Sequence, residues 1–211
     1  MAGLREQKKQ HMRRTLSDTA AALFLERGFD GFRITDVAEA CGVSEKTVYN
    51  YFPTKESLIM DRLEATATAL RTAITGPGDP LDACLAMLAT ERAATATAAT
   101  AATATATTAT TAGGGDRYRR FGDLLRATPS LRAYRSEMHD RFVTIAAEAL
   151  CHRTGLPPGD PGAEIAAHAL IGLWRVQADS LRRHDDQART AADMTRAAEI
   201  TRAALTALRP T

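Results

Sequence analysis

Apolar residues recur at helical spacing along most of this chain. The first such segment runs from about Arg14 to Arg27, and Gly28 is placed to end it as a helix. The apolar residues that share one face of this helix are Leu16, Ala20, Leu23 and Phe24. Valine, isoleucine and aromatic residues never gather into the alternating runs that are typical of strands. The pattern therefore predicts an all-α fold, with about nine helices and no strand.

Residues that cap helices divide the next part of the chain into three further elements. Thr35 is predicted to cap a second helix, and Ser44 is predicted to cap a third helix that ends at Pro53. Thr54 is predicted to cap a fourth, longer helix, which ends at the Gly-Pro-Gly sequence of residues 76–78. One side of this fourth helix carries Ile59, Leu63, Thr66, Leu70 and Ala73.

The helical pattern continues in the second half of the chain. Asp79 is predicted to cap a new helix that has Pro80 at its first position. A long helix begins at Thr128-Pro129 and shows one face made of Leu131, Tyr134, Met138, Phe142, Ile145 and Ala149. No residue from Ile165 to Trp174 is formally charged, so this helix is expected to be covered on more than one side. The last helix carries Met194, Ala197, Ala198, Thr201, Leu205 and Leu208 on one face.

The composition agrees with a helical protein that has a modest core. Of the 211 residues 45% are hydrophobic, but alanine supplies much of this share and aromatic residues make up only 5%. Residues 93–112 contain only alanine and threonine, and they lack a periodicity that would distinguish a helix from a loop. These side chains are too weakly apolar for a membrane helix, and no apolar stretch near the N-terminus suggests a signal peptide.

Neither the cysteines nor the histidines form a motif that carries chemistry. Cys41, Cys84 and Cys151 are far apart and have no metal-ligand spacing, so they are expected to be small buried residues of a cytoplasmic protein. No histidine lies in a nucleophile, metal or phosphate-loop motif, and His168 is expected to lie in the core or in a pocket. We therefore expect neither an enzyme nor a bound metal or cofactor.

Residues 34–52 have the pattern of a helix-turn-helix, in which two short helices meet at a turn. Ala38 is small enough to let the two helices approach, and Gly42 supplies the permissive backbone of the turn. The inward positions are Val37, Val43, Val48 and Phe52, which are expected to pack against Leu23 and Phe24. The outward positions are Glu45, Lys46, Thr47, Tyr49 and Asn50, and several of these side chains suit phosphates and base edges in the major groove. A plain helical hairpin is the alternative, but it requires neither a capped short helix nor a small residue at the crossing.

A basic segment precedes the predicted helices. Residues 1–14 hold Arg5, Lys8, Lys9, Arg13 and Arg14 against a single acidic residue, Glu6. In residues 15–60 seven acidic residues stand against four basic ones, although the net charge of the whole chain is +2. If the helix-turn-helix binds DNA, this arm must supply much of the electrostatic attraction, and binding should weaken with salt.

The stretch from residue 27 to residue 58 resembles the DNA-binding domain of the TetR (tetracycline-repressor-like) family of transcriptional regulators. The resemblance rests on Arg27-Gly28-Phe29, Ile34-Thr35-Asp36-Val37-Ala38, Gly42-Val43-Ser44 and Thr47-Val48-Tyr49-Asn50-Tyr51-Phe52-Pro53-Thr54-Lys55-Glu56. These motifs cover about the first quarter of the chain. The remainder is similar to the family only in architecture, as a larger helical regulatory domain of about the expected length.

Carried over residue by residue, the resemblance implies a set of DNA contacts. Thr35, Tyr51 and Lys55 would contact phosphates, and Lys46, Thr47, Tyr49 and Asn50 would meet bases or the adjoining backbone. Ser44, at the start of the recognition helix, completes the predicted DNA-binding set. The resemblance also implies a ligand-responsive repressor that binds a palindromic operator as a homodimer.

The expected division of the chain is a DNA-binding domain at residues 1–55 and a regulatory domain at residues 56–211. The uncharged helix and the alanine-rich face of the last helix fit a four-helix bundle between two copies, although both helices would also fit an ordinary core. An effector pocket is expected among Phe121, Leu125, Tyr134, Met138, Phe142 and Trp174, each of which would also suit a core position. A protein–protein adaptor is a further alternative, and the exposed polar face of residues 44–50 argues against it.

Overall fold

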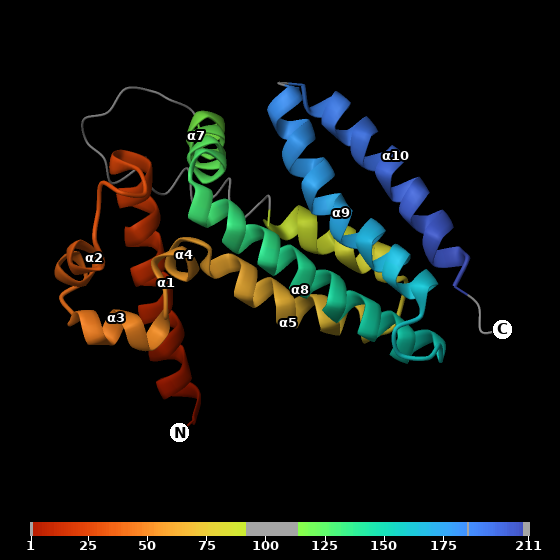
Figure 1. Cartoon of the computed structure of the whole chain (residues 1–211), viewed down its shortest axis with the longest axis horizontal. Helices are drawn as coiled ribbons and strands as arrows, with labels where there is room; N and C mark the ends of the chain where they lie inside the picture. The colour runs from red at the N-terminus through yellow and green to blue at the C-terminus, as the bar shows by residue number, and fades with distance from the viewer. Residues whose placement is uncertain (1, 92–113, 185, 209–211) are drawn as a thin grey trace. The chain divides into compact units, whose positions relative to one another are not determined.

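The computed structural model describes residues 2–91, 114–184 and 186–208 (Figure 1). Within these ranges the regular secondary structure is entirely α-helical, which confirms the all-α prediction. The helices are α1 (Ala2–Arg27), α2 (Ile34–Ala40), α3 (Glu45–Tyr51), α4 (Lys55–Ile59), α5 (Asp61–Thr75), α7 (Gly114–Ala127), α8 (Pro129–Thr154), α9 (Pro161–Arg183) and α10 (Gln187–Thr206). Residues 80–91 are also helical, while the alanine–threonine tract 93–112 lies outside the described residues.

None of the helices in the described ranges combines the length and the apolar character needed to cross a membrane.

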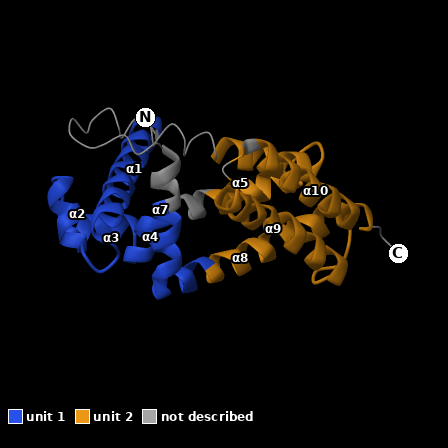
Figure 2. Cartoon of the chain, turned by 90° about the horizontal axis from the view of Figure 1, so that it is seen from above, with its two compact units in different colours: residues 1–64, 108–135 blue, residues 65–107, 136–211 orange. Residues whose placement is uncertain are grey.

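The chain forms two compact units (Figure 2). Unit 1 comprises residues 1–64 and 108–135, and unit 2 comprises residues 65–107 and 136–211. Unit 1 is therefore larger than the N-terminal domain of residues 1–55 that the sequence suggested. The reason lies in side-chain packing, because the ring of Phe121 on α7 meets that of Phe24 on α1 edge to face, with 5.2 Å between centroids.

The core of unit 1 holds the helix-turn-helix against α1. Val37 and Val48 are completely buried, and Phe52 is 1% exposed, so these side chains point inward as the pattern predicts. Val43 and Leu23 are partly buried against the same cluster. The buried residues of this core are Leu16, Ala20, Phe24, Phe32, Ile34, Val37, Ala38, Val48, Phe52, Leu58, Ile59, Met60 and Leu131.

The first helix is longer than the apolar pattern indicates. α1 begins at Ala2 rather than near Arg14, so the basic arm is the N-terminal part of this helix. Residues 3–11 are all exposed, and a helix segment that packs on no other element needs no apolar face. The spacing of apolar residues therefore gives no signal for this part of α1, although Leu, Glu, Gln and Lys are good helix formers.

The predicted fourth helix is two helices. Thr54 caps α4 as expected, since its Oγ1 accepts the Ser57 N–H at 3.1 Å, and the Ser57 Oγ accepts the Thr54 N–H at 3.2 Å. The helix then ends at Met60, and α5 begins at Asp61. Met60 is buried and neither glycine nor proline stands near it, so the apolar pattern continues through the break without a signal.

Unit 2 contains α9 and α10, which pack along each other. Asp160 caps α9 by accepting the Ala163 N–H at 2.9 Å, and Asp79 accepts the Leu81 N–H at 2.8 Å, which confirms its capping role. The turn after α5 is held by Arg153 of α8, whose guanidinium donates to the carbonyls of Ile74 and Gly76 at 3.1 and 2.6 Å.

One expectation about α9 is wrong. His168 is exposed, not a core or pocket residue, and Ile165 one turn earlier is 66% exposed. Within one chain, α9 buries Ala166, Ala167, Leu170, Ile171 and Leu173 on its inner side. The uncharged segment of residues 165–174 is therefore covered by other residues of the same chain on only part of its circumference.

Candidate nucleic-acid interface

The turn between α2 and α3 is closed by backbone hydrogen bonds. Gly42 has a φ of +65°, a left-handed backbone conformation that residues other than glycine rarely adopt. Its N–H donates to the carbonyl of Glu39 at 3.1 Å. The N–H of Val43 donates to the carbonyl of Ala38 at 2.9 Å. Ala38 is 3% exposed, which agrees with the need for a small residue where the two helices cross.

Ser44 sets the start of α3. Its Oγ accepts the Thr47 N–H at 3.2 Å, and the hydroxyls of Ser44 and Thr47 lie 2.9 Å apart. This is the N-cap interaction that the sequence predicts. Both hydroxyls are thus already hydrogen-bonded to each other at the first turn of α3, where free backbone N–H groups also favour an anion.

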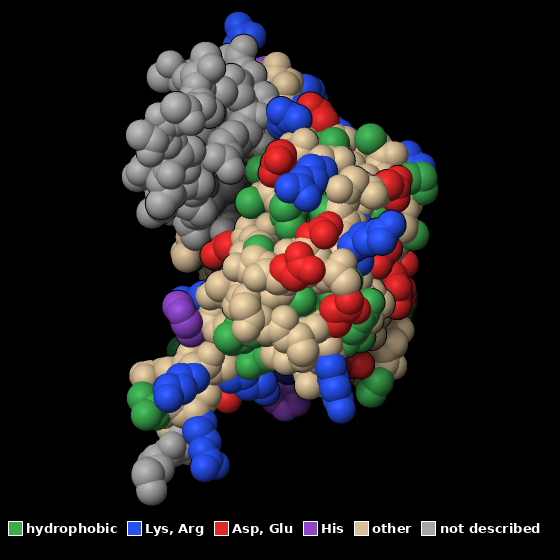
Figure 3. Space-filling view, turned by 90° about the vertical axis from the view of Figure 1, so that its left-hand side faces the viewer, with side chains coloured by type: hydrophobic (Ala, Val, Ile, Leu, Met, Phe, Trp, Pro, Cys, Tyr) green, Lys and Arg blue, Asp and Glu red, His purple; other side chains and the backbone are tan. Residues whose placement is uncertain are grey.

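The outer face of α3 carries side chains that suit DNA. Lys46 and Asn50 are exposed and Tyr49 is 49% exposed, whereas Val48 between them is completely buried. This orientation matches the division into inward and outward positions drawn from the sequence, although Thr47 is only half exposed. Acidic and basic side chains mingle on the surface seen from the side of α2 and α3 (Figure 3).

Thr35 and Tyr51 occupy positions different from those on the outer face of α3. Thr35 does not cap α2, because the helix begins at Ile34 and the cap residue is Arg33. The Arg33 N–H instead donates to the carboxylate of Asp36 at 2.7 Å. An aspartate three residues after the cap residue does not by itself indicate in the sequence that the helix begins at Ile34. Thr35 still lies in the first turn of α2, and Tyr51 is half-buried against the unit 1 core.

Lys55 is held by the loop between α1 and α2. Its ammonium donates to the carbonyl oxygens of Phe29 and Phe32, and it lies 4.5 and 4.0 Å from the centroids of their rings. Burial lowers the pKa of Lys55, and the carboxylates of Asp30, Glu56 and Asp36 oppose this shift. Lys55, which the resemblance assigns to a phosphate, therefore has structural partners within the protein. No residue close to Lys55 in the sequence indicates these contacts.

Arg13 of the basic arm also has a structural contact. Its Nε lies 2.5 Å from the carboxylate of Asp61, and its guanidinium carbon lies 4.8 Å from the centre of the Phe52 ring. Arg13 thereby joins α1 to the start of α5 and to the end of α3. Arg5, Lys8, Lys9 and Arg14 are exposed, and they remain the cations of the arm that can face a polyanion.

The six residues expected around an effector are divided between the two units. Phe121, Leu125 and Tyr134 pack against the core of unit 1, and Leu131 beside them is part of it. The other three belong to unit 2, where Met138 and Phe142 are buried and the Trp174 indole donates to Glu91 at 2.9 Å. The pocket itself remains a prediction.

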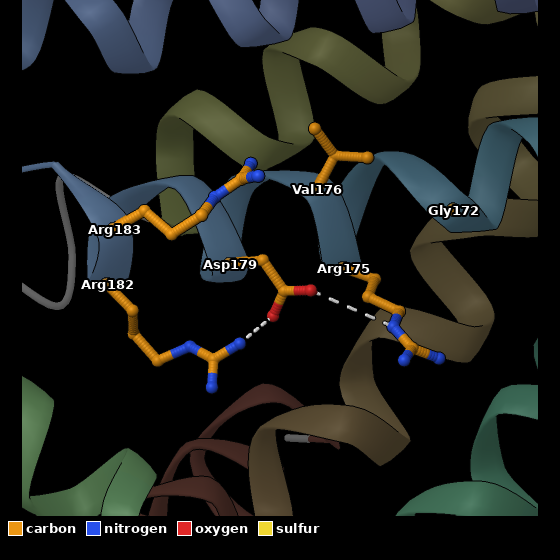
Figure 4. Close-up of a pocket in the computed structure, with 6 residues that line it drawn as sticks. All are labelled: Gly172, Arg175, Val176, Asp179, Arg182 and Arg183. Carbon is orange, nitrogen blue, oxygen red and sulfur yellow. Dashed lines mark hydrogen bonds and ion pairs between the residues drawn. The ribbon is translucent and has the colours of Figure 1, made fainter.

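An open groove of about 570 Å³ lies along α9 in unit 2 (Figure 4). Its lining residues are Gly172, Arg175, Val176, Asp179, Arg182 and Arg183. The Asp179 carboxylate pairs with Arg182 and lies 3.9 Å from Arg175. The guanidinium charges are therefore partly neutralised within the groove, and none of the predicted effector residues lines it.

Comparisons with known sequences find similarity to transcriptional regulators. Residues 16–60 match the family model described as bacterial regulatory proteins, tetR family. MftR of Mycobacterium tuberculosis, named for transcriptional regulation of mycofactocin biosynthesis, is 22% identical over 158 residues, which are 75% of this chain and 73% of that protein. The transcriptional repressor KstR2 of Rhodococcus jostii is 39% identical over 51 residues, or 24% of this chain and 25% of that protein.

A crystal structure of a TetR-family regulator from Streptomyces coelicolor is also similar, with a TM-score of 0.44 and 22% identity. That similarity covers 93% of this chain and 96% of the other.

Proposed function

We propose that this chain is a TetR-family transcriptional regulator, which acts in the cytoplasm as a repressor and binds a palindromic operator as a homodimer. A small-molecule effector would release the operator, and no catalytic step is involved. The observation that carries the proposal is the geometry of α3, a capped helix that buries Val48 and exposes Lys46, Tyr49 and Asn50.

The exposed side chains of α3 have complementary tasks on DNA. Asn50 can pair with adenine through two hydrogen bonds, and Lys46 can donate to guanine or to a phosphate. Tyr49 offers a hydroxyl and an apolar ring at half exposure. Ser44 and Thr47 lie at the helix N-terminus, where hydroxyl and backbone N–H groups together suit a phosphate.

The dimer would form through the outer faces of α9 and α10. Ile165 on α9 and Ile200 on α10 are 66% and 62% exposed, and such large apolar side chains are costly to leave in water. A second copy would cover them and complete a four-helix bundle. Two recognition helices related by a two-fold axis would then read half-sites about 34–36 Å apart or a multiple of that distance.

Release of the operator requires an effector that prefers one arrangement of the dimer, because equal affinity for both states shifts no equilibrium. Apolar side chains that suit such a ligand are present in unit 2 at Met138, Phe142 and Trp174. The Glu91 carboxylate accepts the Trp174 indole N–H at 2.9 Å, so this ring also has a polar partner.

A gel-shift titration with the DNA upstream of the protein's own gene tests the DNA-binding proposal. Lys46→Ala should lower operator affinity and reduce its dependence on salt. Arg71→Ala is the matched control, because Arg71 is an exposed cation on α5, paired with Glu148 at 3.0 Å. Equal losses in both variants, or no specific retardation of the wild type, would refute the proposed role of α3.

Analytical ultracentrifugation tests the dimer separately. Ile200→Glu places a charge on the exposed side of α10, so the single chain should still fold while dimerisation weakens. Leu173→Glu is unsuitable for this purpose because Leu173 is 1% exposed within its own chain. A wild-type monomer at micromolar concentration that binds one half-site tightly would exclude the dimer.

A further inference from the structure

Two imidazole rings from different helices lie close together in unit 2. The ring centroids of His139 on α8 and His168 on α9 are 6.3 Å apart, and the ring planes are inclined by 41°. His168 is exposed and His139 is half-buried, so solvent reaches this pair. The two residues are distant in sequence, and no spacing motif could have revealed them.

The separation of the rings is close to that of two ligands of one metal ion. A divalent ion such as Zn²⁺ lies 2.0–2.1 Å from a ligating imidazole nitrogen, so two rings that bind it at a tetrahedral angle have centres roughly 5 Å apart. The observed centroid distance of 6.3 Å exceeds this value by about 1 Å. The two side chains must therefore turn toward each other for one ion to bind both.

We propose that His139 and His168 form a two-histidine site for a late first-row divalent ion, with Zn²⁺ and Ni²⁺ as the natural probes. Imidazole favours these ions, whereas Mg²⁺ and Ca²⁺ require oxygen ligands. The described residues contain no group of three or more His, Cys, Asp or Glu side chains that could enclose an ion. Water therefore fills the remaining positions, and the ion exchanges readily.

Binding at this site ties α8 to α9. The two histidines are close only in the folded chain, so the ion binds the folded state in preference to the unfolded one and raises its stability. Glu164 lies one turn before His168 on α9 and is exposed, so a carboxylate on that helix is available to favour a cation. The site is independent of the DNA-binding proposal, which concerns unit 1.

The test is a Zn²⁺ titration of the full chain without an affinity tag, in competition with a chromophoric chelator. The wild type should bind one Zn²⁺, and its melting temperature should rise as Zn²⁺ is added. His139→Ala and His168→Ala should each weaken binding by at least about tenfold, since losing a metal ligand costs no less than losing a residue that orients one. Circular dichroism checks that both variants remain helical.

His152→Ala is the matched control, because His152 is exposed on the same helix as His139. It should bind Zn²⁺ as the wild type does. The proposal is overturned if His152→Ala loses as much affinity as the two site variants, or if those variants keep the wild-type affinity. It is also overturned if Zn²⁺ binding disappears in Cys41→Ser instead, since Cys41 is the half-buried thiol of the chain.

Discussion

Replacing Lys55 by methionine separates two roles of one side chain. The resemblance to TetR regulators assigns Lys55 to a phosphate, whereas the structure places its ammonium on the carbonyls of Phe29 and Phe32. Methionine keeps an unbranched apolar stem of similar length and removes the charge. If the structural contacts dominate, the loss should appear first in the stability of the free protein.

The size of this loss follows from the contacts. A hydrogen bond to a charged group contributes about 1.5–3 kcal/mol, and a cation–π contact at a partly exposed site about 0.5–1 kcal/mol. These values do not add, because one ammonium makes all the contacts and gives up water to do so. The lowered pKa of Lys55 shows that burial disfavours the charged form. We therefore expect Lys55→Met to lower the free energy of unfolding by about 2 kcal/mol, close to one charged hydrogen bond.

Urea unfolding followed by circular dichroism measures the stability, and a gel shift measures operator affinity. Lys46→Met is the matched control, because Lys46 is exposed on α3. It should keep the wild-type stability and lose DNA affinity. A structural role for Lys55 is refuted if Lys55→Met behaves like Lys46→Met, with unchanged unfolding and weakened DNA binding, since the ammonium would then serve the operator.

Three further predictions concern other parts of the chain. Ser44→Ala removes the cap of α3 and should lower the free energy of unfolding by about 1 kcal/mol in urea titrations, and an unchanged value would mean that the cap contributes nothing. Deleting residues 2–9 removes Arg5, Lys8 and Lys9 and should flatten the slope of log affinity against log salt, so an unaltered slope would show that the arm never approaches phosphate. Burial, with a smaller effect of Asp79, raises the pKa of the Cys84 thiol to about 12. Iodoacetamide at pH 8 should therefore modify Cys41 long before Cys84 in the native protein, as mass spectrometry of digests would reveal, and equal rates would place Cys84 nearer the surface.

The elements of the helix-turn-helix were predictable because their signals are local. Ser44, Gly42 and Val48 each act within a few residues of their own position, through a cap, a turn and an inward face. The same local logic identified the outward position of Tyr49. Caps, turns and periodicity depend on neighbours in sequence, so a single sequence is enough to reveal them.

The contacts that sequence reasoning missed join residues that are distant along the chain. Arg13 reaches Asp61 across 48 positions, and Lys55 reaches Phe29 across 26. Nothing in the sequence ranks one charged partner above another at such separations. The break at Met60 was missed for a related reason, because buried apolar residues continue on both sides of it.

The unbroken α1 helix gives the positive charges of the arm a fixed angular phase relative to α3. A straight helix of 26 residues is roughly 39 Å long, and each residue turns it by about 100°. One alanine inserted between Gln10 and His11 would therefore swing Arg5, Lys8 and Lys9 to a different side of the axis. Seven inserted residues would return them to within about 20° of their original direction. If the arm were a flexible tail, neither insertion would change DNA binding. In a rigid helix, the one-residue insertion should weaken the contribution of these charges to DNA binding, and the seven-residue insertion should restore it.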